Sequence, residues 1–224
     1  TMTKQTFQTK RLLRRQLRRT RQKRFRKPTL TFSPTAWSKL RFLRDLGPTE
    51  IGAFGIAPPG NLLRVEELQL IKQDCTTVTV KFDDTAVAEF FEDQVDLGRA
   101  PEQFGRIWIH MHPGNCPRPS SVDRATFRRC FGRCDWAVML ILARNDSTYA
   151  ELHWKQGQAR LPLRVEIDYS QPFSETKFEE WEQEYRQHVQ SRDRQPDEFS
   201  DWIFEDFSQN DHEPINTPLL ETCR

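Results

Sequence analysis

The chain has 224 residues, of which 36% are hydrophobic and 29% are charged, enough for one well-buried domain with additional segments or for two very small domains. No apolar run approaches the roughly 18 residues that a membrane-spanning helix needs, so we expect a soluble protein without membrane contacts. The five cysteines are loosely spaced, which makes a poor disulfide framework and favours a reducing, cytoplasmic location.

The charge is unevenly distributed along the chain. Residues 1–27 contain twelve of the 34 Lys and Arg residues and none of the 32 Asp and Glu residues, which leaves 22 basic and 32 acidic residues, a net charge of −10, in the rest. We expect residues 1–30 to form a basic arm that is flexible or helical. Such blocks are usually interaction segments, so the arm is predicted to pair with the acidic body itself, or to bind a polyanion or a partner protein.

Residues 31–170 have the pattern of an α/β domain. Ser33 is a candidate N-cap, with Pro34 in the first helical turn. The predicted helices cover residues 34–46, 84–97 and 121–133, and the predicted strands cover residues 50–57, 62–71, 76–82, 105–112, 136–144, 149–154 and 161–167. Strands 62–71 and 76–82 are expected to be antiparallel, and the apolar run 136–144 is typical of a strand buried on both faces. This order predicts a mixed β-sheet flanked by helices.

The chain changes character after Tyr169. Residues 171–190 form a predicted acidic helix, in which the amphipathic pattern covers residues 174–190. Residues 191–224 are an acidic, weakly patterned tail that contains the acidic and aromatic sequence FSDWIFEDF. Segments of this kind often dock onto a partner or fold back onto their own domain.

Two histidines, His110 and His112, lie one residue apart at the end of the predicted strand 105–112. Because side chains alternate along a strand, both imidazoles point to the same face and can bind one metal ion. The intervening Met111 and the preceding Ile109 point to the opposite face. The spacing therefore favours a metal site over a loop that merely contains histidines.

Asp123, in the first turn of the next predicted helix, is a natural third ligand. Zinc in a catalytic site typically has three protein ligands, and the proline-rich loop 113–119 can turn the chain back to bring this helix beside the histidines. Ser120 and Asp123 also have the spacing of a capping box, and capping alone explains Asp123 better than catalysis does. The two roles are compatible if Ser121 caps the helix while Asp123 binds the metal.

Together these residues resemble the signature of the JAMM (MPN+) zinc metalloproteases. The family pattern of His-x-His, seven residues and Ser-x-x-Asp is matched by His110, His112, Ser120 and Asp123. The upstream sequence EIGAFGI is similar to the family's Glu-x-Gly-x-x-Gly strand, which indicates Glu50 as the fifth residue. All five positions are matched, which makes the signal much stronger than two histidines alone.

The resemblance implies a single JAMM/MPN-like domain with Zn²⁺ bound by His110, His112 and Asp123. It implies that Glu50 acts as a general base and then as a general acid, and that Ser120 donates a hydrogen bond to the oxyanion. Family members hydrolyse the isopeptide or peptide bond after the C-terminal glycine of ubiquitin or a ubiquitin-like modifier, whose tail lies extended beside a strand. We therefore predict a zinc-dependent, deubiquitinase-like isopeptidase.

The likeness in element order covers about residues 35–168 and includes departures from the pattern. Met111 occupies a position that is usually Ser or Thr, and we expect only a change in packing because it faces away from the metal. The loop 113–119 is short, and no added Cys/His cluster is present, which indicates a compact, prokaryotic-type or divergent member. Two alternatives are a non-catalytic MPN-like scaffold that binds nucleic acid through its basic arm, and a JAMM hydrolase of a sulfur-carrier adduct. Scaffold members generally lack the metal ligands, which argues against the first of these.

Other candidate residues have weaker support. Cys116, Cys130 and Cys134 could form a closed structural zinc site with the histidines, although buried cysteines usually act as small apolar residues. Glu66 and Glu67 compete with Glu50 as the base, but their alternating strand predicts that they face solvent. The histidines outside any motif are His153, His188 and His212.

Overall fold

The computed structural model describes residues 27–155, 157, 159–170 and 172–192. The elements along the chain are β1 (Thr29–Phe32), α2 (Pro34–Asp45), β2 (Ile51–Ile56), β3 (Arg64–Val65), β4 (Glu67–Leu70), β5 (Gln73–Cys75), β6 (Val80–Phe82), α3 (Asp84–Asp96), α4 (Pro101–Phe104), β7 (Ile107–Met111), α5 (Ser121–Phe131), β8 (Trp136–Leu142), β9 (Thr148–Trp154), β10 (Ala159–Pro162), β11 (Arg164–Ile167), α6 (Phe178–His188) and β12 (Val189–Ser191). The mixed α/β class predicted from the sequence is confirmed.

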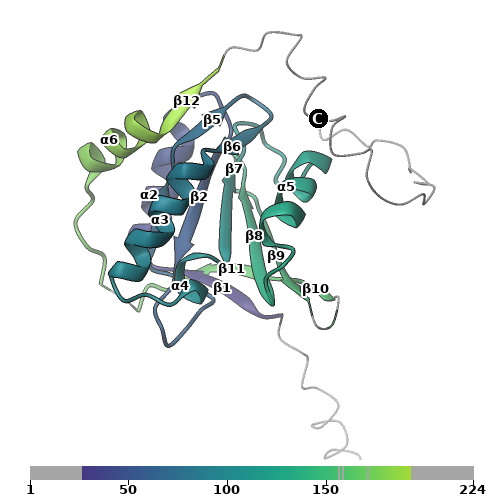
Figure 1. The fold of residues 1–224 in the computed structure, drawn as a ribbon. Helices are drawn as coiled ribbons and strands as arrows, with labels where there is room; N and C mark the ends of the chain where they lie inside the picture. The colour runs from purple at the N-terminus through teal and green to yellow at the C-terminus, as the bar shows by residue number, and fades with distance from the viewer. Residues whose placement is uncertain (1–26, 156, 158, 171, 193–224) are drawn as a thin grey trace, which may run out of the picture.

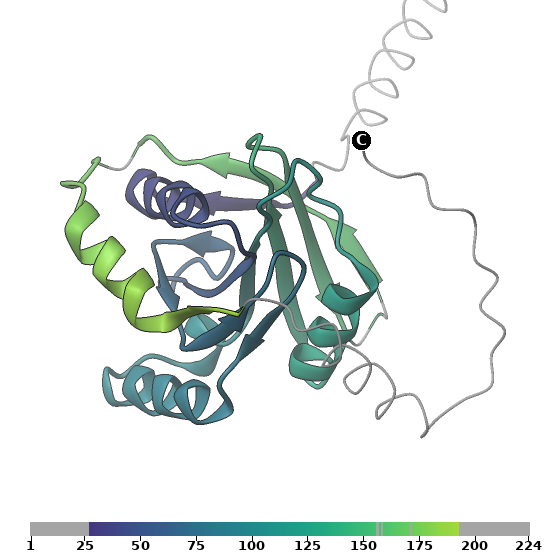
Figure 2. The ribbon, with the colours of Figure 1, turned by 90° about the horizontal axis from the view of Figure 1, so that it is seen from above.

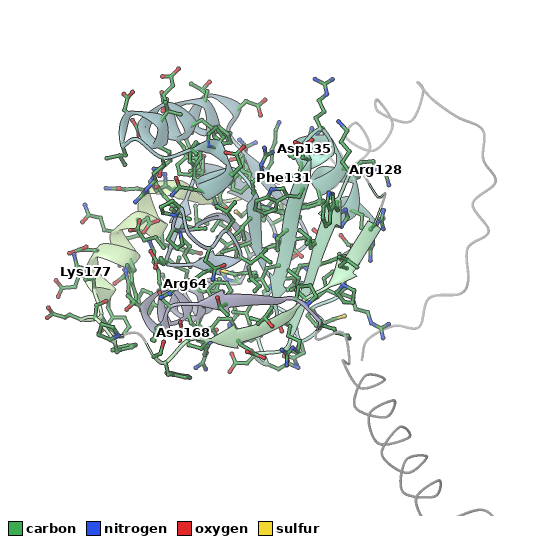
Figure 3. The ribbon with its side chains drawn as sticks, turned by 90° about the horizontal axis from the view of Figure 1, so that it is seen from below. Arg64, Arg128, Phe131, Asp135, Asp168 and Lys177 are labelled. Carbon is green, nitrogen blue, oxygen red and sulfur yellow. The ribbon has the colours of Figure 1, made fainter. Side chains whose placement is uncertain are left out.

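A six-stranded sheet in the order β10-β9-β8-β7-β2-β4 forms the centre of the domain (Figure 1). β7 is parallel to β8, and the other neighbouring pairs in this sheet are antiparallel. Two three-stranded sheets, β11-β1-β3 and β12-β5-β6, extend it. In the first of them the guanidinium of Arg64 lies 3.6 Å from the carboxylate of Asp168, and both side chains are visible from below in Figure 3.

Helices cover both faces of the central sheet and form two separate apolar clusters with it (Figure 2). On one face, Leu40 of α2 and Trp181 of α6 are buried in the first cluster. On the other face, Phe90 of α3, Phe104 of α4 and Phe127 of α5 belong to the second. Because β2 and β7 lie between the two clusters, every residue of both strands is buried. β8 is buried at all but its first residue, as its continuous apolar run predicts.

The predicted helix boundaries are close to those observed. α2 begins after Ser33, whose hydroxyl accepts a hydrogen bond from the backbone N–H of Ala36, with Pro34 as the first helical residue. α3 ends one residue before the predicted position, and Gly98 follows it with a positive φ of 75°, a conformation that glycine adopts without steric cost.

Two predicted strands are each divided between sheets. The predicted strand 62–71 is split at Glu66 into β3, which pairs with β1, and β4, which pairs with β2. The predicted strand 161–167 is split at Leu163 into β10 and β11, which pair with β9 and β1. In residues 161–167 the alternation of apolar residues continues across Leu163, so the periodicity there contains no sign of the change of sheet. In residues 62–71 the alternation shifts by one residue between Val65 and Leu68, a break that the prediction of a single strand did not use.

The predicted strand 76–82 is also partly wrong. Only its second half is a strand, and β6 forms a hairpin with β5 rather than pairing with residues 62–71. The first half is the hairpin turn, in which Thr76 N–H donates to the carbonyl oxygen of Thr79 at 2.9 Å. The sequence pattern missed β5 and β12 because three residues are too few to show an alternation.

α6 and β12 complete the domain on the α2 face. α6 is shorter than the predicted 174–190, and its Trp181 packs on Phe42 of α2 with ring centroids 5.8 Å apart. The carboxylate of Glu184 accepts the N–H of Leu70 at 2.9 Å, at the edge strand β4. β12 then pairs in parallel with β5, so this C-terminal segment is part of the packed domain.

Two predicted regions lie outside the described residues. They are the basic arm up to residue 26 and the tail from residue 193, which contains FSDWIFEDF and His212. Within the residues that the structure describes, no helix combines the length and the apolar character needed to span a membrane.

Candidate metal centre

The antiparallel pairing of β2 with β7 brings Glu50 next to the two histidines. In this register Ile51 is opposite Met111 and Gly52 is opposite His110, so Glu50, one residue before β2, comes opposite His112. The backbone N–H of Glu50 donates to the carbonyl oxygen of Thr76 at 2.8 Å. The pairing of these two strands therefore brings Glu50 beside His110, although the two residues are sixty positions apart in the sequence.

The side chains of β7 alternate between the two faces of the sheet, as predicted. Ile109 and Met111 belong to the apolar cluster on the α2 face. Trp108, on the α5 face, stacks on His110 with ring centroids 5.1 Å apart and an interplanar angle of 25°. The centroids of His110 and His112 are 4.8 Å apart, and both rings are buried. The strand therefore presents two adjacent imidazoles in a site with little water.

Glu50, His110, His112 and Asp123 form one buried group whose potential ligand atoms all lie within 4.8 Å of one another. His110 Nε2 is 3.2 Å from Glu50 Oε2 and 3.3 Å from Asp123 Oδ1. His112 Nε2 is 3.6 Å from Glu50 Oε1 and 3.7 Å from Asp123 Oδ2. Two nitrogen and two carboxylate donors thus converge on a small volume, which is a group able to hold a metal ion.

The orientation of His112 supports a metal as the missing partner. Its Nδ1 donates a hydrogen bond to the carbonyl oxygen of Cys116 at 2.8 Å. A carbonyl oxygen only accepts, so the neutral ring has its lone pair on Nε2, and such a contact often orients a metal-binding histidine. Nε2 is buried without a hydrogen-bond partner, and a buried polar atom in this state is costly unless something binds it.

Asp123 is oriented by Ser120 at the start of α5. The Ser120 backbone N–H and hydroxyl donate to Asp123 Oδ2 at 2.7 and 2.8 Å, and the Asp123 N–H donates to the Ser120 hydroxyl oxygen at 3.1 Å. The N-cap is therefore Ser120, and the expectation that Ser121 caps the helix is wrong. Asp123 has both roles at once, because Oδ2 completes the capping box while Oδ1 faces His110.

The two carboxylates shift the pKa values of this group. Burial lowers the pKa of His112, but the nearby Asp123 carboxylate, the hydrogen bond to Cys116 and the charge of Glu50 outweigh it, so the pKa is raised. Burial raises the pKa of Asp123, but His112, His110 and the two Ser120 donors outweigh it, so the pKa is well below its usual range. Asp123 is therefore ionised at neutral pH, the state that a metal ligand requires.

Gln73 of β5 supports the site and was not identified from the sequence. Its buried amide accepts the N–H of Gly52 at 2.7 Å and donates to the carbonyl oxygens of Gly52 and Ile71 at 2.8 Å each. β4 pairs with β2 only from Ala53 onward, so the Gln73 side chain takes the place of a strand beside the two residues after Glu50. A lone glutamine in a short strand has no pattern that predicts this role.

The other candidates do not join the group. Glu66 and Glu67 are exposed, as predicted, and Cys130 is exposed on α5. Among the described residues, no cysteine belongs to a cluster of three or more potential ligands. His153 pairs with Glu151 at 2.6 Å, while His188 lines a separate cleft beside α6. No protein-family model matches the chain, and no curated protein matches it.

Proposed function

We propose that the protein is a zinc-dependent isopeptidase or peptidase of the JAMM (MPN+) type, which removes a ubiquitin-like modifier. The observation that carries this proposal is the buried group of Glu50, His110, His112 and Asp123, whose ligand atoms lie within 4.8 Å of one another. The unpartnered Nε2 of His112 and the ionised Asp123 fit a divalent cation better than a purely structural role.

His110, His112 and Asp123 are the residues that would hold the ion. Zinc bound by two imidazoles and one carboxylate supplies a Lewis acid and lowers the pKa of a coordinated water from about 15.7 to about 7. The contacts from Cys116 to His112 and from Ser120 to Asp123 keep these two side chains aimed at the same point. The chain therefore holds its donors in position before the ion binds, which limits the ordering cost of metal binding.

Glu50 is the proton carrier in this proposal. It is 7% exposed, and its two carboxylate oxygens lie 3.2 and 3.6 Å from the Nε2 atoms of His110 and His112. From this position it accepts the proton of the attacking water and delivers it to the leaving amine. A carboxylate with that role must stay close to the ligands without being needed to hold the metal.

Ser120 is proposed to stabilise the oxyanion of the tetrahedral intermediate. In the structure its hydroxyl hydrogen is directed at Asp123 Oδ2. To donate to a substrate oxygen, the hydroxyl must turn away from that carboxylate, while the Ser120 backbone N–H keeps its own bond to Oδ2. The capping box thus allows the hydroxyl to move without releasing Asp123.

The extended tail of the modifier is proposed to pair with β6. This strand is at the edge of the β12-β5-β6 sheet, so one side of its backbone has no neighbouring strand among the described elements. Phe82 of β6 packs against Gly52, where an added Cβ would come within 2.6 Å of its ring, so β6 lies beside the residues that follow Glu50. Addition of a strand at such an edge provides backbone hydrogen bonds with little dependence on sequence.

Metal analysis and a single substitution test the proposal. The purified full chain should contain close to one zinc per molecule and little iron. Glu50→Gln should keep the zinc and lower the cleavage rate of a ubiquitin-like fusion by about 10²- to 10⁴-fold, because only the proton carrier is lost. Glu66→Gln, an exposed glutamate, is the matched control and should leave the rate unchanged.

Several results would contradict the proposal. A protein without bound zinc, or a Glu50→Gln variant as active as wild type, would exclude the proposed mechanism. Loss of zinc from Glu50→Gln would show instead that Glu50 is a fourth ligand, which is typical of a closed structural site.

A further inference from the structure

A second feature of the domain is a cleft of about 310 Å³ between α5 and the strands β8, β9 and β10. Its walls include the buried residues Phe127, Phe131, Ala137 and Met139 and the half-exposed ring of Trp154. An aromatic side chain of a ligand could therefore be buried here against apolar surface. None of these residues belongs to the metal centre.

The cleft is also strongly cationic. Arg124, Arg128, Lys155 and Arg160 line it, and no carboxylate does. Within the part of the chain that the structure describes, Arg128 and Arg160 make no ion pair, whereas Arg124 lies 4.0 Å from Glu151. Figure 3 shows Arg128 and Phe131 at the same corner of the domain. The cleft thus combines an apolar floor with the unpaired positive charges of Arg128 and Arg160, which suits an acidic segment containing aromatic residues.

The chain itself contains such a segment. Residues 197–207, DEFSDWIFEDF, include five acidic residues, four aromatic residues and no basic residue. Trp202 is ten residues beyond Arg192, the last described residue, and an extended chain of that length reaches roughly 35 Å. A small domain has a diameter of about 30 Å, so this segment can reach the cleft in cis. The effective concentration of a segment tethered in this way is on the order of millimolar.

We propose that residues 197–207 dock in this cleft, with aromatic side chains on the apolar floor and carboxylates paired with Arg128 and Arg160. Charge complementarity and the aromatic residues of the segment favour this occupant over a nucleic acid. Phosphates could also pair with the basic residues, but the acidic segment of the chain would then have no binding site on the domain. The proposal is independent of the chemistry at the metal centre, since it rests on a different set of residues.

A photo-crosslinker in the full chain tests the docking. Trp202 is replaced by benzoylphenylalanine, which keeps an aromatic side chain, and the products of irradiation are mapped by mass spectrometry. We expect intramolecular cross-links to peptides that contain residues 124–131 or 159–162. The double variant Arg128→Glu/Arg160→Glu should lower their yield by about five-fold or more, because two attractive contacts become repulsive.

Two controls separate docking from other effects. Arg129→Glu changes the adjacent exposed arginine, which does not line the cleft, and should alter the yield by less than about two-fold. Reversing Asp201, Glu205 and Asp206 to lysine should reproduce the loss without any change to the cleft, even if the arginine variant fails to fold. Cross-links confined to dimers, no cross-link to these peptides, or equal yields in all variants would each overturn the proposal.

Discussion

Two histidine–carboxylate groups lie close to the aromatic layer of Trp108 and Phe127, and they differ in what they can bind. The candidate metal centre places two histidines and two carboxylates together, with His110 stacked on Trp108. The second group is a single pair, His153 and Glu151, in which His153 lies 4.5 Å from the ring of Phe127. The same residue types therefore occur twice within one α/β domain.

The number of carboxylates and the presence of cations explain the difference. Burial lowers the pKa of His153, and Arg160 and Arg124 lower it further, so that Glu151 does not compensate. Burial lowers the pKa of His112 as well, but two carboxylates and the Cys116 carbonyl raise it above its ordinary value. The two carboxylates beside His110 and His112 leave an excess of negative charge that favours a cation, whereas the single carboxylate of Glu151 lies near Arg124 and Arg160, which disfavour one.

Among the predicted effects, the largest is the loss of zinc affinity when a predicted ligand is removed. His112→Ala should weaken zinc binding by about 100- to 1,000-fold, since each ligand supplies roughly a quarter of the 10–16 kcal/mol of a typical site. His153→Ala, which removes the histidine of the other group, should leave the affinity within about two-fold. Competition with a chromophoric chelator measures both, and equal losses in the two variants would refute the assignment of the ligands.

The zinc affinity and the stability of the metal-free protein should both depend on pH through His112. Zinc competes with a proton at His112. Below the raised pKa of this residue, each increase of one pH unit should therefore raise the zinc affinity by about ten-fold. Without metal, the stability from protonated His112 is complete below its unfolded pKa of about 6.5 and is lost as the pH rises through the higher folded pKa.

As the pH rises from about 6.5 through the raised pKa of His112, the metal-free protein should therefore become less stable, while zinc binding becomes tighter. Chemical denaturation with and without a chelator measures the two opposite slopes. In His112→Gln the free energy of unfolding of the metal-free protein should decrease less as the pH rises. An unchanged slope would show that another group causes the pH dependence.

Substitution of Gln73, whose side chain bonds to the strand after Glu50, should lower the stability of the domain. Gln73→Leu removes the partners of the Gly52 N–H and of two carbonyl oxygens, and should lower the free energy of unfolding by about 1–3 kcal/mol. Gln187→Leu on the exposed face of α6 is the matched control and should change it by less than about 0.5 kcal/mol. Urea denaturation distinguishes them, and similar values would mean that the Gln73 contacts add little.

The smallest effect is expected at the helix cap. Ser120→Ala should lower the free energy of unfolding by about 1 kcal/mol and the zinc affinity by about ten-fold, because Asp123 loses a donor that orients it. Ser120→Thr keeps the hydroxyl and should restore most of both quantities. If alanine and threonine behave alike, the hydroxyl does not orient Asp123.

Much of the candidate site could be predicted because its information is local. Alternation along a strand places His110 and His112 on one face, and the first turn of a helix places Asp123 near Ser120. The choice between Ser120 and Ser121 as the cap could not be made this way, because both are good N-cap residues and the extended backbone at Ser120 (φ −70°, ψ 174°) depends on how the loop enters the helix. Gln73 was missed for a related reason, since its role depends on where β4 stops pairing with β2.

Local sequence patterns were sufficient to predict the α/β class, the boundaries of the main helices and the placing of His110, His112 and Asp123, because periodicity and caps depend on neighbouring residues. Glu50 was indicated only by the resemblance to the JAMM signature. The tertiary structure decided which strands share a sheet, how residues 62–71 and 161–167 divide, and how the register of β2 and β7 places Glu50 opposite His112. The tertiary structure also brings together three arginines from α5 and β10 and Lys155, which follows β9, around one apolar cleft. These are contacts between segments distant in sequence, and the free energy of packing selects them only when the whole domain is assembled.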